Sequence, residues 1–150
     1  MFGKEKNPLA VVIKASFEEA RLRGDRRMGT EHLLLGLLHH AESAQALGVD
    51  LAAARAALED LDRAALRMLG LEVGDLPGTP RKHPRVPDTA LTSSARSVLN
   101  QAVKATTMKT RHEVPRHLAL ILLEQPPPDP VAQLVDQLGI DRTTVRSRIR

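Results

Sequence analysis

Residues 29–38 read GTEHLLLGLL. Thr30 is a residue type that caps helix N-termini, and a nearly unbroken run of leucines follows Glu31 and His32. The pattern predicts a helix that is apolar on almost every side, and such a helix lies in the middle of a bundle rather than on its surface. Residues 117–123, HLALILL, repeat the His-Leu pattern 85 positions later.

A second element is also duplicated. LGVD at residues 47–50 matches LGID at residues 138–141, and Arg55 matches Arg146 in the same register, a shift of 91. The shift increases from 85 to 91 because the second half has additional residues, EQPPP, between its two matching elements. Helix signals follow one another in the same order in both halves, at 8–23, 30–38, 41–47 and 50–69, then at 92–106, 115–123, 131–138 and from 141 onward.

We therefore predict an all-α fold, in which a duplicated four-helix repeat forms a pseudo-two-fold helical bundle. Repeat one is expected over about 8–69, a Gly- and Pro-rich linker over about 70–91, and repeat two over about 92–150. A unit of roughly 60 residues buries little apolar surface by itself. We expect the two repeats to share one core within a single domain, residues 1–150.

Composition excludes several classes of protein. The 150 residues contain no Cys and only 1% aromatics, which argues against disulfide scaffolds, Cys-ligated metals, thiol catalysis and aromatic stacking on single-stranded nucleic acid. No apolar stretch approaches the roughly 20 residues of a membrane span. Nothing at the N-terminus resembles a signal peptide, so we expect a cytoplasmic location.

Net charge differs between the halves, at −2 for residues 1–80 and +6 for residues 81–150. A basic half is compatible with an acidic protein partner or with nucleic acid. A nucleic-acid-associated regulator that uses the basic C-terminal half therefore stays open as an alternative function. We do not expect it to be the main one, because the sequence carries neither a helix-turn-helix core nor an aromatic platform.

The motif at 29–38, together with FEEAR at 17–21 and the opening Met1-Phe2, resembles the Clp N-terminal repeat domain, most closely the ClpC type. The resemblance covers nearly the whole chain and is weakest over 70–92. It implies an all-helical, non-catalytic module that docks peptides, adaptor proteins or marked substrates for a Clp ATPase or protease. The long linker and the altered second motif favour a stand-alone paralogue, acting as a regulator, adaptor or decoy.

The resemblance also implies two sites. Some relatives bind phosphorylated arginine through the Glu of Gly-Thr-Glu-His, which places Thr30 and Glu31 in a guanidinium site. In repeat two, Arg116 stands where the acid is expected, so we expect guanidinium binding in the first repeat alone. Relatives from actinobacteria receive cyclic peptide antibiotics on an outer face, which here corresponds to Phe2, Ile13, Phe17, Leu91 and Arg96.

We expect no catalytic residues, no cofactor and no metal. The chain has no GxxxxGK[ST] phosphate loop, so no nucleotide hydrolysis is expected. His32 and His39 share a helix face, but no carboxylate completes a ligand set around them. His32 and His117 occupy equivalent places, which predicts a shared structural role: a ring at the start of a helix that is hydrogen-bonded to a neighbouring loop.

Overall fold

The computed structural model describes residues 7–70, 84–106 and 112–149. Within these ranges the chain forms eight helices and no strand. They are α1 (Pro8–Arg23), α2 (Thr30–Leu37), α3 (Ala41–Leu47), α4 (Leu51–Met68), α5 (Ser93–Lys104), α6 (Val114–Leu123), α7 (Pro130–Leu138) and α8 (Arg142–Ile149). The prediction of an all-α bundle is confirmed.

Several predicted helix boundaries follow from local chemistry. Asn7, Asp50 and Thr92 cap α1, α4 and α5, each accepting a hydrogen bond from a first-turn N–H. Gly24 ends α1 in the left-handed conformation, with φ +77°, which glycine adopts without strain. One predicted cap is wrong: Gly29 is the N-cap of α2, and Thr30 is the first helical residue.

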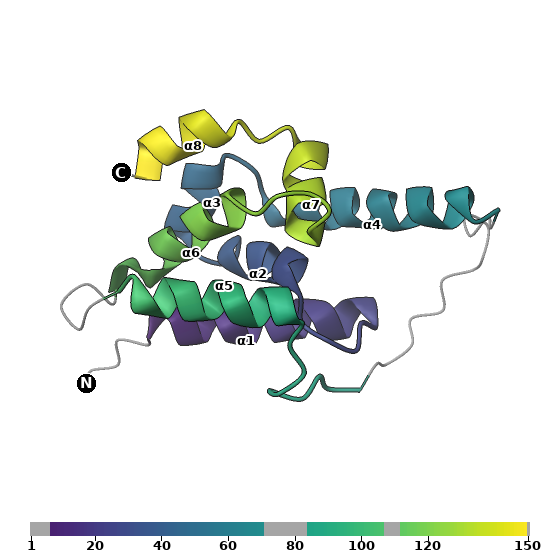
Figure 1. Cartoon of the computed structure of the whole chain (residues 1–150), viewed down its shortest axis with the longest axis horizontal. Helices are drawn as coiled ribbons and strands as arrows, with labels where there is room; N and C mark the ends of the chain where they lie inside the picture. Colours follow the sequence, from purple (N-terminus) through teal and green to yellow (C-terminus); the bar gives the residue numbers. More distant parts are fainter. Residues whose placement is uncertain (1–6, 71–83, 107–111, 150) are drawn as a thin grey trace.

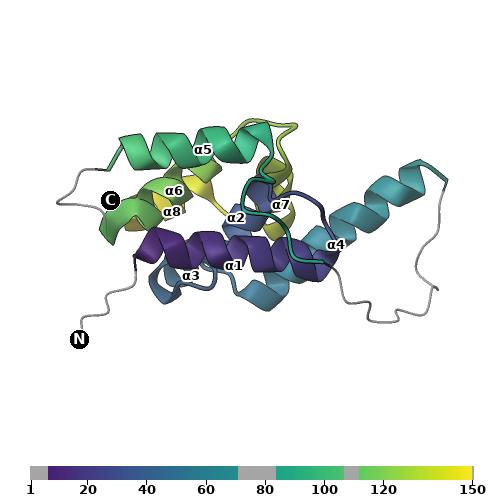
Figure 2. The ribbon, with the colours of Figure 1, turned by 90° about the horizontal axis from the view of Figure 1, so that it is seen from below.

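Contacts between the halves follow a two-fold relation. Exchanging the halves pairs α1 with α5, α2 with α6, α3 with α7 and α4 with α8. The contact of α1 with α6 is then matched by that of α2 with α5, and the contact of α4 with α7 by that of α3 with α8. Helix α2 packs on α6 where the halves meet (Figures 1 and 2).

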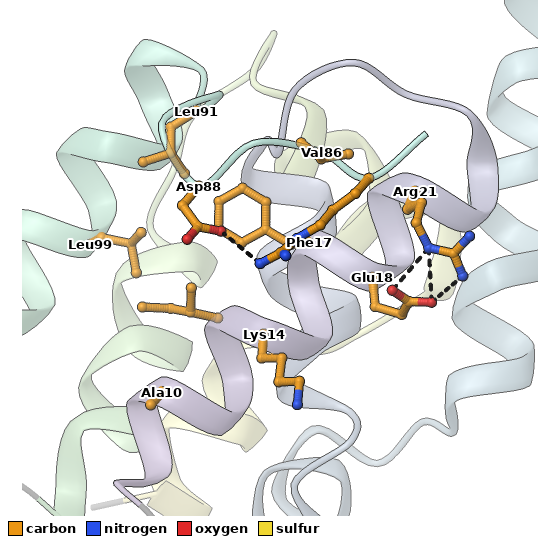
Figure 3. A pocket seen from close by; sticks show the side chains of 11 residues that line it. Ala10, Lys14, Phe17, Glu18, Arg21, Val86, Asp88, Leu91 and Leu99 are labelled. Atoms are coloured by element: carbon orange, nitrogen blue, oxygen red, sulfur yellow. Dashed lines mark hydrogen bonds and ion pairs between the residues drawn. The ribbon is translucent and has the colours of Figure 1, made fainter. Parts of the chain in front are cut away.

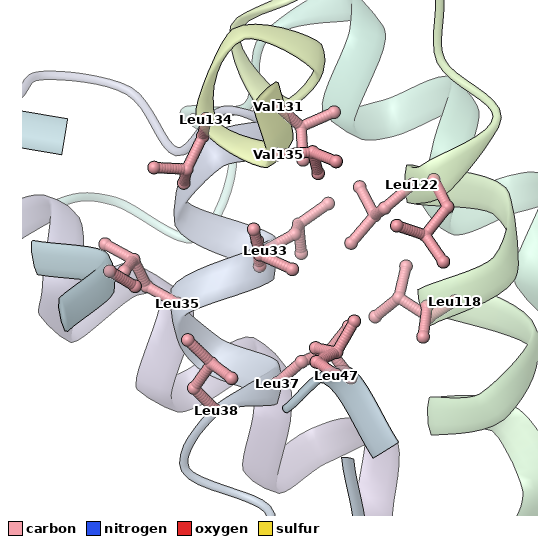
Figure 4. Packing of buried hydrophobic residues seen from close by; sticks show 14 of the residues in the cluster. Leu33, Leu35, Leu37, Leu38, Leu47, Leu118, Leu122, Val131, Leu134 and Val135 are labelled. Atoms are coloured by element: carbon pink, nitrogen blue, oxygen red, sulfur yellow. The ribbon is translucent and has the colours of Figure 1, made fainter. Parts of the chain in front are cut away.

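The core lies where the leucine runs of the two halves meet. Leu33, Leu35 and Leu37 of α2 are fully buried, as are Leu118 and Leu134 of the second half (Figure 4). All of these residues belong to one apolar cluster that takes in residues from every helix. Burial of this kind contributes roughly 1.5–3 kcal/mol per large side chain, so the leucines that the two halves share stabilise their association.

Gly36 allows α1 and α2 to approach closely. A Cβ at this position would lie 2.0 Å from Ser16 Oγ and 2.6 Å from the carbonyl oxygen of Val12. The Ser16 hydroxyl donates to that same carbonyl at 2.7 Å, which satisfies a buried polar group inside the crossing. The glycine in the leucine run is therefore a packing residue.

The end of the predicted linker is anchored to the bundle. Met28 N–H donates to the carbonyl of Ala90 at 2.8 Å, and Thr92 N–H donates to the carbonyl of Met28 at 3.0 Å. Val86 is buried. Residues 84–92 thus form a fixed strap beside α1, which the Gly/Pro composition did not predict. Phe2 and residues 71–83 lie outside the described residues.

Candidate functional site

A groove of about 860 Å³ runs between α1, α5 and the strap. Its apolar lining comes from α1 (Ala10, Ile13, Phe17), the strap (Val86, Leu91) and α5 (Leu99) (Figure 3). The three apolar residues of α1 follow one another at intervals of three and four positions, so one face of that helix supplies them. The structure therefore brings together the predicted residues Ile13, Phe17 and Leu91.

Charged side chains border this groove. Glu18 and Arg21 form an ion pair along α1, and hydrogen bonding to Arg21 holds the pKa of Glu18 below its ordinary value. Arg85 and Asp88 of the strap lie 3.8 Å apart. Lys14 also lines the groove, is exposed, and makes no ion pair within the part of the chain that the structure describes.

Arg96 does not line the groove. It lies on the exposed side of α5, in a polar hollow with Ser93, Ser97, Asn100 and Lys104. The resemblance to Clp N-terminal domains had grouped Arg96 with the apolar face. Leu99, one turn further along α5, lines the groove, whereas Arg96 lines the polar hollow beside it.

The Glu31 carboxylate folds back over Gly29 at the start of α2. A Cβ on Gly29 would lie 2.1 Å from Glu31 Oε1, so the absence of a side chain makes room for the acid. Glu31 Oε1 is buried and has no hydrogen-bond partner among the described residues. His32 Nδ1 lies 3.7 Å away but already accepts a hydrogen bond from Gly29 N–H at 2.9 Å, so it donates nothing to the acid.

Thr30 lies beneath this site. Its side chain is buried, and its hydroxyl donates to Asp129, the N-cap of α7, while accepting a hydrogen bond from Val131 N–H at 3.3 Å. These bonds join the starts of α2 and α7 directly. Thr30 therefore positions Glu31 from within the bundle, and its hydroxyl is occupied by protein partners.

His32 and His117 both connect a helix to the segment before it. The His32 ring is 2% exposed, and its Nε2 lies 2.7 Å from Asp25 Oδ2 in the loop before α2. His117 Nδ1 lies 2.9 Å from the hydroxyl of Thr106, beyond the end of α5. The shared structural role is confirmed by these contacts.

A buried ion cluster around Glu19 was not predicted. Glu19 is 1% exposed, and its carboxylate meets Arg55 of α4 at 2.9 and 2.6 Å and His39 at 2.8 Å. Burial by itself raises the pKa of Glu19, but the hydrogen bonds from Arg55 and His39 outweigh it and bring that pKa below the ordinary value. Glu19 lies seven residues after Val12 and three after Ser16, and this one-face spacing is the sequence signal that places it on the buried side of α1.

The second repeat presents a different surface where α6 begins. Arg116 is exposed, and its guanidinium lies 3.8 Å from Glu113. It lines a small hollow of about 130 Å³ between α3, α6 and α8, together with His40, Glu42, His112 and Arg148. Pro115, which matches Thr30, has no hydroxyl with which to join the two helix starts, so the contact seen in the first repeat has no counterpart here.

Two further findings concern the described residues. Across residues 7–70, 84–106 and 112–149, no group of three or more His, Asp or Glu side chains is placed to hold a metal ion. None of the described helices has the length and apolarity needed to cross a membrane.

Comparison with known proteins places the chain among Clp proteins. Residues 6–115 match the family described as the Clp repeat (R) N-terminal domain. A relative described as the ATP-dependent Clp protease ATP-binding subunit ClpA homolog, from Cyanidium caldarium, is 28% identical over 155 aligned positions. The alignment covers 99% of this chain and 16% of that relative, so the chain spans about one sixth of its length. From the family match and the duplicated helical plan, the chain belongs to the Clp N-terminal repeat domain family.

Proposed function

We propose that this protein is a non-catalytic binding module of the Clp chaperone–protease system, which holds an apolar segment of a partner protein in the groove between α1, α5 and the strap. The observation that carries the proposal is the groove itself. It is about 860 Å³ in volume, within the range of sites that enclose a ligand, and its lining is mainly apolar. Partners of this kind include substrates, adaptors and Clp components, with the module acting as a regulator, adaptor or decoy.

The same groove is the candidate site for cyclic apolar peptides. Ile13, Phe17 and Leu91 are each half-buried, so they retain apolar surface for a ligand to cover. Covering such surface contributes about 25 cal/mol per Å² of apolar area removed from water.

The basic C-terminal half is less available for nucleic acid than its charge suggests. Arg142 donates to the carbonyl of Leu123 at 3.1 Å and to Asp136 at 3.0 Å, and Arg148 donates to the carbonyl of Ala46 at 3.2 Å. These contacts hold α8 on the bundle. They favour the protein-binding function over the nucleic-acid alternative.

Selection of phage-displayed random 12-residue peptides tests this function. We expect the wild-type protein to enrich apolar peptides, and Ile13→Asp to weaken their binding by about ten-fold or more, because a charge would then be covered without a partner. Leu22→Asp is the matched control, since Leu22 lies on α1 outside the groove and is 53% exposed. Enriched peptides that bind the folded Ile13→Asp protein as tightly as the wild type would refute the groove as the site.

A second candidate function, capture of a guanidinium group such as that of phosphorylated arginine, is favoured by the orphan Oε1 of Glu31. A guanidinium would supply the donor that this oxygen lacks. Calorimetric titration of free phosphoarginine tests it, with loss of affinity on the order of 10² expected for Glu31→Gln.

Gly29→Ala makes that test sharper. The backbone at Gly29, with φ −107° and ψ −177°, suits alanine, but the added Cβ displaces the carboxylate while its charge stays. We expect weaker phosphoarginine binding in this variant too. Failure of the wild type to bind at millimolar phosphoarginine would leave Glu31 as a helix-start residue only.

A further inference from the structure

We propose that the groove selects apolar ligands that carry a carboxylate, and that Lys14 is the residue that recognises it. This inference rests on the proposed binding function of the groove and deepens it by naming the chemistry of the ligand. Its basis is the distribution of charge among the residues that line the groove.

Four of the five charged groove residues already have partners. Glu18 accepts three hydrogen bonds from Arg21, so its negative charge is largely neutralised by a residue of the same helix. Arg85 faces Asp88 across the turn of the strap. These two pairs leave the groove with one excess positive charge, on Lys14.

Lys14 is placed so that a ligand in the groove meets it. It lies one residue after Ile13 and one turn before Phe17 and Glu18, on the edge of the face that lines the groove (Figure 3). The nearest acid on its own helix is Glu18. Although the charge of Lys14 contributes to lowering the pKa of that acid, the contribution of Arg21 is larger, and no ion pair joins Lys14 to Glu18.

Charge complementarity therefore favours a ligand with apolar side chains toward Ile13 and Phe17 and one carboxylate toward Lys14. An Asp or Glu side chain and a free C-terminus both supply that group. An ion pair at such an exposed position changes affinity by about two- to five-fold and weakens as salt is added.

The experiment uses the most strongly enriched peptide from the phage selection, synthesised with Glu or Gln at one position and with a free or amidated C-terminus. Binding of these four fluorescently labelled forms is measured by anisotropy. We expect the wild type to bind a form with the carboxylate about two- to five-fold more tightly than the matching form without it. A preference for Glu over Gln would identify a side-chain carboxylate, and a preference for the free over the amidated end would identify the C-terminus.

Lys14→Ala should abolish that preference, and Lys14→Glu should reverse it. Lys104→Glu, an equal change of net charge on the exposed side of α5, should leave it unchanged. Peptides that require Ile13 but bind equally in all four forms would overturn this inference and leave the proposed function standing. Absence of any peptide that requires Ile13 would overturn both.

Discussion

The two repeats share a helix plan but differ in the chemistry that joins their helices. In the first repeat, buried and half-buried charges connect α1, the loop after it, α2 and α4. Glu19 meets Arg55 and His39, and Asp25 meets both His32 and Arg23. In the described part of the second repeat, the exposed pair of Arg142 with Asp136 and the half-buried contact of His117 with Thr106 join the helices instead.

This difference shows which parts of a duplicated fold tolerate change. Core positions at matching places stay non-polar, although their volumes differ where Leu34 is matched by Ala119 and Gly36 by Ile121. Polar positions near the helix starts diverge, so that Glu31 of the first repeat is matched by Arg116 and Thr30 by Pro115. The backbone plan persists while the surface it presents changes from acidic to basic.

The largest effect is expected where the repeats are alike. Leu33 and Leu118 occupy matching positions and are both fully buried, so Leu33→Ala and Leu118→Ala should each lower the free energy of unfolding by about 2–5 kcal/mol. Urea denaturation followed by circular dichroism measures this. Because the halves share one core, we expect a single transition in both variants, and two separate transitions would show that the repeats unfold independently.

Gly36→Ala tests a difference in helix packing between the repeats. Gly36 allows the close approach of α1 to α2, whereas the matching position in α6 is Ile121. Replacing an exposed helical glycine with alanine raises the free energy of unfolding by about 1 kcal/mol. Here the new Cβ would clash with Ser16 and with the Val12 carbonyl. We therefore expect Gly36→Ala to lower the free energy of unfolding by about 2–3 kcal/mol instead. The double variant with Ser16→Ala should recover only part of the loss in thermal denaturation, because the backbone clash remains.

Glu19→Gln tests the buried ion cluster of the first repeat. Hydrogen bonds to a charged group contribute about 1.5–3 kcal/mol to the free energy of unfolding. We expect Glu19→Gln to lower that free energy by a similar amount at pH 7. The folded pKa of Glu19 lies below its ordinary value of 4.5, so the stabilisation is complete above that pH and is lost as pH falls through the folded pKa.

The stability gap between wild type and Glu19→Gln should therefore narrow below about pH 4.5. Glu59→Gln is a suitable control, because Glu59 forms an exposed pair with Arg63 and should change stability by less than about 0.5 kcal/mol. A gap that is independent of pH would mean that Glu19 stabilises the fold through its shape rather than its charge.

The smallest effect is expected from making the second repeat resemble the first. Arg116→Glu places a carboxylate where α6 begins, and calorimetry should then detect a second phosphoarginine site. We expect it to be about ten-fold weaker than the first, because the side chain at position 116 is 55% exposed, compared with 20% for Glu31. Arg116→Gln removes the cation without adding an acid and should show one site only.

Much of the fold could be predicted because its signals are local. Asp50 and Thr92 carry the capping chemistry that begins α4 and α5, and the leucine run after His32 has room only in the middle of a bundle. The equivalence of His32 and His117 was also visible, since both precede the same apolar pattern. These features depend on residues within a turn or two of one another.

The candidate site was only partly predictable. Ile13, Phe17 and Leu91 could be named from resemblance, but the contribution of Val86 depends on where the strap lies. Arg96 was named with them from the same resemblance, and the structure places it in the polar hollow of α5 rather than in the lining of the groove.

The helices, their order and their duplication could be predicted from the amino-acid sequence, because capping residues and apolar periodicity act over a few residues. The contacts that these helices make are set by the packed bundle. It buries Glu19 between Arg55 and His39, closes Gly36 onto Ser16, and leaves Glu31 Oε1 without a hydrogen-bond donor among the described residues. These outcomes depend on contacts between segments far apart in the chain, whose free energies appear only when both segments are in place.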